Sequence, residues 1–254
     1  MKGMYIMIEI FYLHNSGFTI ELGNDALIID YYKGRLQRAW RAPLDKQPAA
    51  YRDVYVFASH AHGDHYNRAI FEWLSEREDI QYILSDDIRS AVPASMARDI
   101  GGAKHTVRYI ADGENLRVGN LDIHAYGSTD AGVSFHILAE DGTSIFHAGD
   151  LNYWHWRDES TDAEVREAFE MFTKELDKLK NGIDKIDVAF FPVDPRMGSD
   201  YYRGAALFCE AMKPSMLIPM HFSHKFSPPP AFYEEVSQYT KIVHVGPDSG
   251  KLAI

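Results

Sequence analysis

Short apolar runs separated by turn residues predict β-strands in the first part of the chain. Three such runs, at residues 4–13, 18–22 and 26–30, are joined by Gly17 and by the Gly-Asn-Asp turn at residues 23–25. Because the connections are so short, the pattern indicates a meander in which successive strands are neighbours.

The rest of the chain mixes strand-like and helix-like segments. Residues 54–58 are apolar at every position, which is typical of a buried strand. Further strands are predicted at residues 80–84, around residues 109, 116 and 121, and at residues 133–139, 144–148, 186–192 and 216–220. Since strands and helices do not alternate strictly, the pattern favours an α/β (α+β) fold with mixed sheets.

Helices are predicted at residues 67–77, 162–180 and 205–212, where apolar positions recur every three to four residues. The second helix has the clearest signals. Thr161 and Glu164 form the sequence pattern of a capping box at its start, and Gly182 is expected to end it.

The segment Ser59-His60-Ala61-His62-Gly63-Asp64-His65 follows the buried run directly and is dense in metal-binding side chains. Imidazole and carboxylate groups are the ligands that zinc and similar divalent ions prefer. In an extended chain, His60 and His62 would leave the same face and converge on one ion. Gly63 allows a sharp turn that would aim Asp64 and His65 at a second ion. The alternative is a polar loop whose histidines cap backbone groups. That alternative would explain any single histidine, but it does not explain the density of the whole motif.

Residues 59–65 resemble the signature of the metallo-β-lactamase fold hydrolases. The resemblance implies a four-layer αβ/βα sandwich, in which two mixed β-sheets carry helices on their outer faces and the metal ligands lie on loops at one edge. Together with residues 18–22 and 27–30, the motif is most similar to the branch that includes the ascorbate-6-phosphate lactonase.

The resemblance also implies the remaining ligands. Asp150 follows the strand-like residues 144–148 in the place of a bridging carboxylate, and a last histidine follows residues 216–220. The first ion would be held by His60 and His62, and Asp150 would bridge the two ions. The ligands implied for the second ion are Asp64, His65 and His221.

At one position the chain departs from the family pattern. A further histidine is expected between the first motif and Asp150, but residues 121–126 run into Gly127-Ser128-Thr129-Asp130 instead. Asp130 falls at or beside the expected ligand position. Two interpretations stand side by side: Asp130 is a metal ligand, or it is a turn residue that satisfies its own loop backbone.

The resemblance implies a metal-dependent hydrolase that uses a metal-activated hydroxide on a small ester, lactone or phosphodiester. Two divalent ions, in the first place Zn2+ with Mn2+ or Fe as alternatives, would lower the pKa of a shared water to roughly 7. Asp64 is expected to accept or relay a proton, and His155 or His14 to protonate the leaving group. Residues 154–156 are expected either to wall a substrate pocket or to pack as ordinary aromatics.

Two other classes of protein are compatible with these residues. The missing histidine is consistent with a non-catalytic or mononuclear metal-binding protein that has a degenerate site. The same fold can carry a diiron redox centre, but this use normally needs a flavin-bearing partner domain, for which the chain leaves no room.

Composition adds bounds on organisation and partners. The 254 residues are 46% hydrophobic and show no break in composition, so a single domain over residues 1–254 is expected. A net charge of -11 disfavours nucleic acid as a partner. The single cysteine, the lack of a leader-like start and the lack of a membrane-spanning apolar run favour a cytoplasmic protein. We expect a small-molecule substrate, no membrane partner and, by the resemblance, a homo-oligomer.

Overall fold

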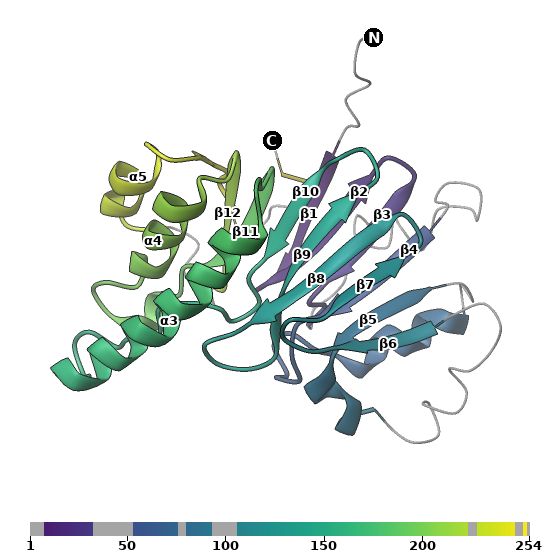
Figure 1. Ribbon diagram of the computed structural model, residues 1–254, viewed down its shortest axis with the longest axis horizontal. Coiled ribbons are helices and arrows are strands. Elements are labelled where there is room, and N and C mark those ends of the chain that lie inside the picture. Colours follow the sequence, from purple (N-terminus) through teal and green to yellow (C-terminus); the bar gives the residue numbers. More distant parts are fainter. Residues whose placement is uncertain are drawn as a thin grey trace, which may run out of the picture. The chain divides into compact units, whose positions relative to one another are not determined.

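The computed structural model describes residues 8–32, 53–75, 80–92, 106–222, 228–246 and 251–252. The chain divides into two compact units, Met1–Ile110 with Asp248–Ile254 (unit 1) and Ala111–Pro247 (unit 2). Each unit is built around one mixed β-sheet (Figure 1). The single domain expected from composition remains a prediction.

Unit 1 contains a six-stranded sheet with the order β1-β2-β3-β4-β5-β6 among its described residues. The first three strands form the predicted antiparallel meander, and β3 to β6 run parallel to one another. Strand β3 ends one residue before the predicted end, because Asp30 turns into the left-handed region with φ 48°. The strands are β1 (Ile8–His14), β2 (Gly17–Leu22), β3 (Asp25–Ile29), β4 (Asp53–Ala58), β5 (Gln81–Ser85) and β6 (Thr106–Ile110).

After its first residue, Asp53, strand β4 is apolar and fully buried, as expected for a strand that lies inside its sheet. Val54 and Val56 belong to a hydrophobic cluster, which also takes in Ile70 and Phe71. The latter two lie on a 3₁₀ helix over Arg68–Ser75, where an α-helix was predicted for residues 67–77. The tighter helix still turns its apolar side toward β4 and β5, so the expected burial is kept.

Unit 2 contains a seven-stranded sheet with the order β13-β12-β11-β10-β9-β8-β7 among its described residues. Strands β7 to β10 are antiparallel, whereas β10 to β13 are parallel. The strands are β7 (Asn115–Val118), β8 (Leu121–Gly127), β9 (Val133–Ala139), β10 (Ser144–His147), β11 (Val188–Pro192), β12 (Met216–Met220) and β13 (Lys241–Ile242).

Helices α3 (Asp162–Gly182), α4 (Arg203–Met212) and α5 (Pro230–Val236) belong to unit 2 (Figure 1). Phe208 of α4 stacks on Phe146 of β10 and Phe191 of β11, with ring centroids 5.3 and 4.6 Å apart. The predicted capping box at the start of α3 is present. The prediction that Gly182 stops this helix is wrong, because Gly182 is still helical. A β-carbon there would collide with the Tyr126 hydroxyl of β8, so glycine permits close packing of α3.

A buried histidine in the sheet of unit 2 makes stability depend on pH. Nε2 of His136 donates to Oγ of Ser144 at 2.9 Å, and that hydroxyl donates to the Lys185 carbonyl at 2.6 Å. Burial, together with a smaller effect of the neighbouring His124 imidazole, lowers the pKa of His136 from 6.5 to about 4. The folded protein therefore holds His136 neutral at a pH where the unfolded chain is protonated.

We expect the free energy of unfolding to fall as the pH drops from 6.5 toward 4, with a contribution from His136 of up to about 3 kcal/mol. The variant His136→Gln keeps a hydrogen-bond donor but does not titrate. Urea unfolding at pH 7 and at pH 4.5 should show a smaller loss of stability for this variant than for the wild type. Equal losses would contradict the assignment.

Candidate metal centre

The predicted metal-binding motif of unit 1 lies at the carboxyl edge of the parallel strands. Asp30 directly follows β3, the motif at residues 59–65 follows β4, and Asp87 follows β5 within two residues. The carboxyl ends of parallel strands meet at one edge of a sheet, which is where α/β folds place their ligand sites. Segments far apart in the sequence are thereby brought together.

Asp30 organises this edge. Its carboxylate accepts hydrogen bonds from the Ser59 backbone amide at 2.7 Å, from the Ser59 hydroxyl at 2.8 Å and from Nδ1 of His65 at 2.7 Å. Asp30 and His65 are both fully buried. Because Nδ1 of His65 carries the donated proton, Nε2 holds the lone pair that could bind a metal ion.

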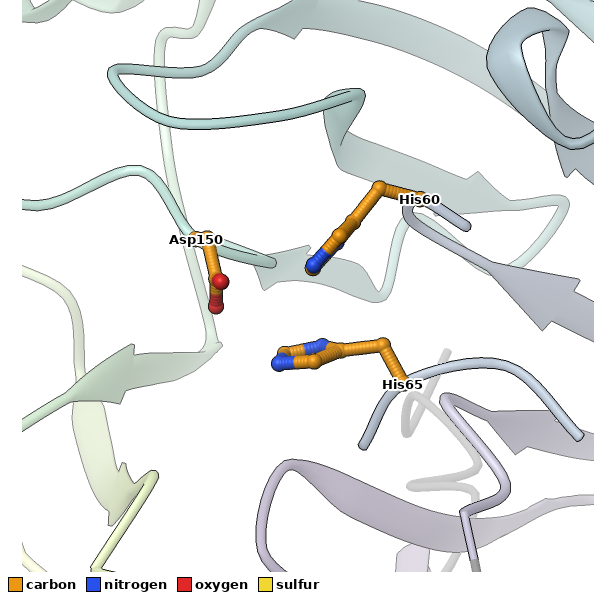
Figure 2. A group of neighbouring side chains, drawn as sticks. All are labelled: His60, His65 and Asp150. Atoms are coloured by element: carbon orange, nitrogen blue, oxygen red, sulfur yellow. The ribbon is translucent and has the colours of Figure 1, made fainter. Parts of the chain in front are cut away.

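His60 is oriented by the same network. Since the Ser59 hydroxyl donates to Asp30, its oxygen accepts from Nδ1 of His60 at 3.0 Å. The imidazoles of His60 and His65 lie 4.2 Å apart between ring centroids (Figure 2). In both rings Nε2 is therefore the nitrogen whose lone pair could bind a metal ion, and both rings are buried.

His62 and Asp64 are more exposed members of the motif. The rings of His60 and His62 meet edge to face at 4.6 Å. Strand alternation does not explain this approach, because β4 ends at Ala58 and a bend brings the rings together. The Asp87 carboxylate holds that bend by accepting from the Ala61 amide at 2.9 Å. Asp64 Oδ2 lies 3.8 Å from Nε2 of His65.

Unit 2 repeats the arrangement with its own parallel strands. Asp150 lies three residues beyond β10, Asp194 two residues beyond β11, and His221 directly after β12. Asp150 is 4% exposed (its carboxylate is drawn in Figure 2), and its Oδ1 lies 3.4 Å from Nε2 of His221. His221 has φ 65°, so the chain turns sharply at this residue as it does at Asp30. The structure thus brings Asp150 and His221 together.

Asp194 holds His221 as Asp30 holds His65. Its Oδ2 accepts from Nδ1 of His221 at 2.9 Å, and the carboxylate also accepts from the Arg196 guanidinium. Burial alone would raise the pKa of Asp194, but the hydrogen bonds from His221 and Arg196 lower it overall. Neither Asp30 nor Asp194 was predicted as a site residue from the sequence. The signal that could have found them is a carboxylate that immediately follows a buried strand.

Asp130 shows features of both interpretations. It is exposed, and its backbone amide donates a hydrogen bond to Oγ of Ser128 at 3.2 Å, as in a polar turn. Yet a carboxylate oxygen of Asp130 lies within 4.8 Å of one of Asp150. Thr129 ties the two loops together, because its hydroxyl donates to the Asn152 carbonyl at 2.5 Å and accepts from the Asn152 amide at 2.9 Å.

The aromatic segment after Asp150 is partly buried. Trp154 donates its indole N–H to the Asp150 carbonyl at 2.8 Å, and its ring lies 5.7 Å from that of His221. His155 is 3% exposed, stacks on Tyr153 at 3.9 Å, and its Nδ1 contacts the Tyr153 carbonyl at 2.9 Å. The expected role of His155 as a proton donor remains a prediction. In unit 1, His14 lies beside Tyr32, with ring centroids 5.4 Å apart.

The donor set fits a divalent transition metal. In both units, a histidine has its Nδ1 bound to a buried carboxylate and its Nε2 beside a further carboxylate oxygen. Carboxylate-bound histidines of this kind are typical of zinc sites, where the outer carboxylate fixes the tautomer of the ligand. The mixture of nitrogen and oxygen donors also suits manganese and iron.

Solved structures with the same fold cover nearly the whole chain. Igni18, a metallo hydrolase from Ignicoccus hospitalis, is 18% identical, with 97% of each chain covered and a TM-score of 0.63. The metallo-β-lactamase fold protein YhfI from Bacillus subtilis is 11% identical, with 98% of this chain and 99% of that chain covered and a TM-score of 0.61. CmlA, a diiron β-hydroxylase from Streptomyces venezuelae, is 12% identical, with 94% and 53% covered and a TM-score of 0.57.

These likenesses confirm the expected fold class, whereas the narrower resemblance to the ascorbate-6-phosphate lactonase branch stays a prediction. Every helix in the described part of the chain is too short or too polar to cross a membrane. A family model described as "Beta-lactamase superfamily domain" matches residues 26–222. Since this match spans most of the 254 residues, the chain belongs to the β-lactamase superfamily.

Proposed function

We propose that this protein is a hydrolase that uses two divalent metal ions, in the first place zinc, to cleave a small ester, lactone or phosphodiester. The observation that carries the proposal is the pair of buried carboxylate–imidazole contacts, Asp30 with His65 and Asp194 with His221. Each contact fixes the orientation and tautomer of a histidine at the carboxyl edge of parallel strands, so that its Nε2 could bind a metal ion. The proposed ligands from both units are His60, His62, Asp64, His65, Asp150 and His221.

Membership of the β-lactamase superfamily supports one shared centre for the proposed ligands, because the matched residues 26–222 include the motif at residues 59–65 as well as Asp150 and His221. When bound, the ions would supply Lewis acidity and a water whose pKa is lowered to about 7. The residues of the chain supply the rest. His60 and His65 provide buried neutral donors, and the Asp150 carboxylate contributes the negative charge that would draw two cations together.

Asp64 is the residue that would handle a proton. Its side chain is 39% exposed, in contrast to the buried imidazoles beside it, so it can meet both solvent and substrate. A carboxylate at this place would accept or relay a proton during attack on the substrate. His155 would protonate the leaving group. Its Nδ1–H would donate to the Tyr153 carbonyl, so Nε2 would be the nitrogen that exchanges a proton.

The proposal is tested by metal analysis together with a substrate panel. Protein purified without chelator should contain about two equivalents of metal, measured by elemental analysis. The metal-loaded protein should hydrolyse at least one class among aryl esters, lactones and phosphodiesters, and a chelator should remove the activity. Two bound equivalents without turnover on any class would contradict the hydrolase assignment.

The same measurements separate the two alternative classes of protein. A mononuclear or non-catalytic metal protein would hold one equivalent or none. A diiron redox protein would contain iron and absorb visible light after aerobic purification. The structural likeness to a diiron hydroxylase is the reason for including iron in the elemental analysis.

Asp130→Ala is expected to weaken metal binding, because Asp130 places a carboxylate oxygen within 4.8 Å of one from Asp150. If Asp130 takes the place of the histidine that the family pattern expects, its loss should raise the dissociation constant of one equivalent by at least about 10-fold. The matched control is Asp184→Ala, which removes an exposed carboxylate elsewhere in unit 2. If Asp130→Ala and Asp184→Ala bind zinc with the same dissociation constants, Asp130 is a turn residue and not a metal ligand.

A further inference from the structure

The turn between β1 and β2 contains an asparagine that contacts the predicted metal-binding motif. Asn15 is 5% exposed, and its side-chain Nδ2 donates to Oδ2 of Asp64 at 3.2 Å. The two residues are 49 positions apart in the sequence. The contact therefore depends on the folded sheet of unit 1 rather than on local chain geometry.

The turn that presents Asn15 is held firmly in place. Asn15 adopts φ 53°. Its backbone forms a hydrogen bond with the Tyr12 hydroxyl, and burial raises the pKa of that hydroxyl to about 12. Ser16 is fully buried. A β-carbon on Gly17 would come within 2.8 Å of the Asp30 carbonyl oxygen, so the turn lies directly against the residue that orients His65. A fixed turn gives the amide of Asn15 a fixed direction.

We infer that Asn15 is a positioning residue, which holds the Asp64 carboxylate in the orientation needed to ligate a metal ion. The inference rests on the proposed function. Asp64 is partly exposed, and the hydrogen bond from Asn15 restricts the rotamers that its side chain can adopt. A carboxylate has about four acceptor positions, so one bond from Asn15 leaves others for an ion. Outer hydrogen bonds of this kind tune the affinity of metal sites.

Asparagine suits both demands of this position. The side-chain amide of asparagine is neutral. It therefore repels a metal ion only weakly, and it does not compete with the Asp64 carboxylate for binding that ion. Asparagine also tolerates the left-handed backbone that the turn requires, as few other side chains do. Glycine accepts the same backbone without any side chain. Asn15→Gly therefore removes the donor while it spares the turn.

The matched control is Asn24→Gly, the same substitution at an exposed position of the neighbouring β2–β3 turn. Zinc affinity is measured for the full-length wild type and both variants by competition with a chromophoric chelator. Absorption of the Co2+-loaded proteins gives a second readout, since the visible bands report the ligand geometry. Thermal melting of the metal-free proteins reports the fold.

We expect Asn15→Gly to weaken one of the two zinc equivalents by about 10- to 100-fold and to change the Co2+ bands, while the other equivalent keeps its affinity. Metal-free melting should match that of Asn24→Gly. If both variants bind zinc with the same affinities as the wild type, the inference about Asn15 is overturned but the proposed function is not. An equal loss of both equivalents with a lowered melting temperature would also overturn it, because that outcome marks a structural role. Fewer than two equivalents in the wild type would overturn the proposed function, and the inference with it.

Discussion

Asp150→Ala protein is expected to lose metal-dependent hydrolysis by more than about 100-fold. Outer hydrogen-bond partners of a metal site typically contribute 10- to 100-fold, and a bridging ligand should contribute more. Asp150 is buried, with Oδ1 3.4 Å from Nε2 of His221. Its backbone carbonyl, which accepts the Trp154 indole N–H, is unchanged by the substitution, so the local loop should persist. The measurements are kcat/KM at saturating zinc and metal content.

Two further variants sharpen this prediction. Asp150→Asn keeps the shape of the side chain but removes its charge, and should lose most of the bound metal if the charge holds two cations together. Asp184→Ala, which removes an exposed carboxylate, should behave as the wild type. Full metal content and turnover in Asp150→Ala would exclude Asp150 as a ligand.

Asp30→Ala is expected to destabilise the metal-free protein by about 3 kcal/mol or more. The substitution leaves the Ser59 amide, the Ser59 hydroxyl and Nδ1 of His65 without their acceptor in a buried site, at about 1–3 kcal/mol each. It also forces alanine into a left-handed backbone conformation at φ 48°, which adds about 1 kcal/mol. Urea unfolding of chelator-treated protein measures the change.

Asp30→Asn provides the matched comparison. Asparagine tolerates the left-handed backbone and keeps one acceptor oxygen, so the loss of stability should be smaller than in Asp30→Ala. The NH2 group that replaces the other carboxylate oxygen cannot accept a hydrogen bond, so at least one bond of the network is lost and zinc affinity should still fall. An Asp30→Ala protein within about 1 kcal/mol of the wild type would show that the Asp30 network contributes little to stability.

Local sequence patterns predict many of the strands and helices of the fold. The apolar run in β4, the meander and the capping box of α3 are set by neighbouring residues, and the structure has them as predicted. Patterns failed where geometry depends on tertiary packing. Glycine as a helix-end signal placed Gly182 outside its helix, whereas the helix includes Gly182, where the lack of a side chain allows close approach of Tyr126. The short 3₁₀ helix over Arg68–Ser75 has an apolar spacing that suits an α-helix equally well.

The candidate site divides along the same line. Ligand residues such as His60 and His65 stand out because they cluster within one short motif. Their supporting partners do not, since Asp30 pairs with a residue 35 positions away and Asp194 with one 27 positions away. A carboxylate after a strand has no distinctive pattern until the parallel register shows which strand ends are neighbours.

Anomalous diffraction from crystals of the zinc-loaded protein would test whether the proposed ligands share one metal pair. We expect two anomalous peaks, with His60, His65, Asp150 and His221 among the side chains that bind them. Peaks bound by residues of only one unit, or metal bound away from these side chains, would contradict this expectation.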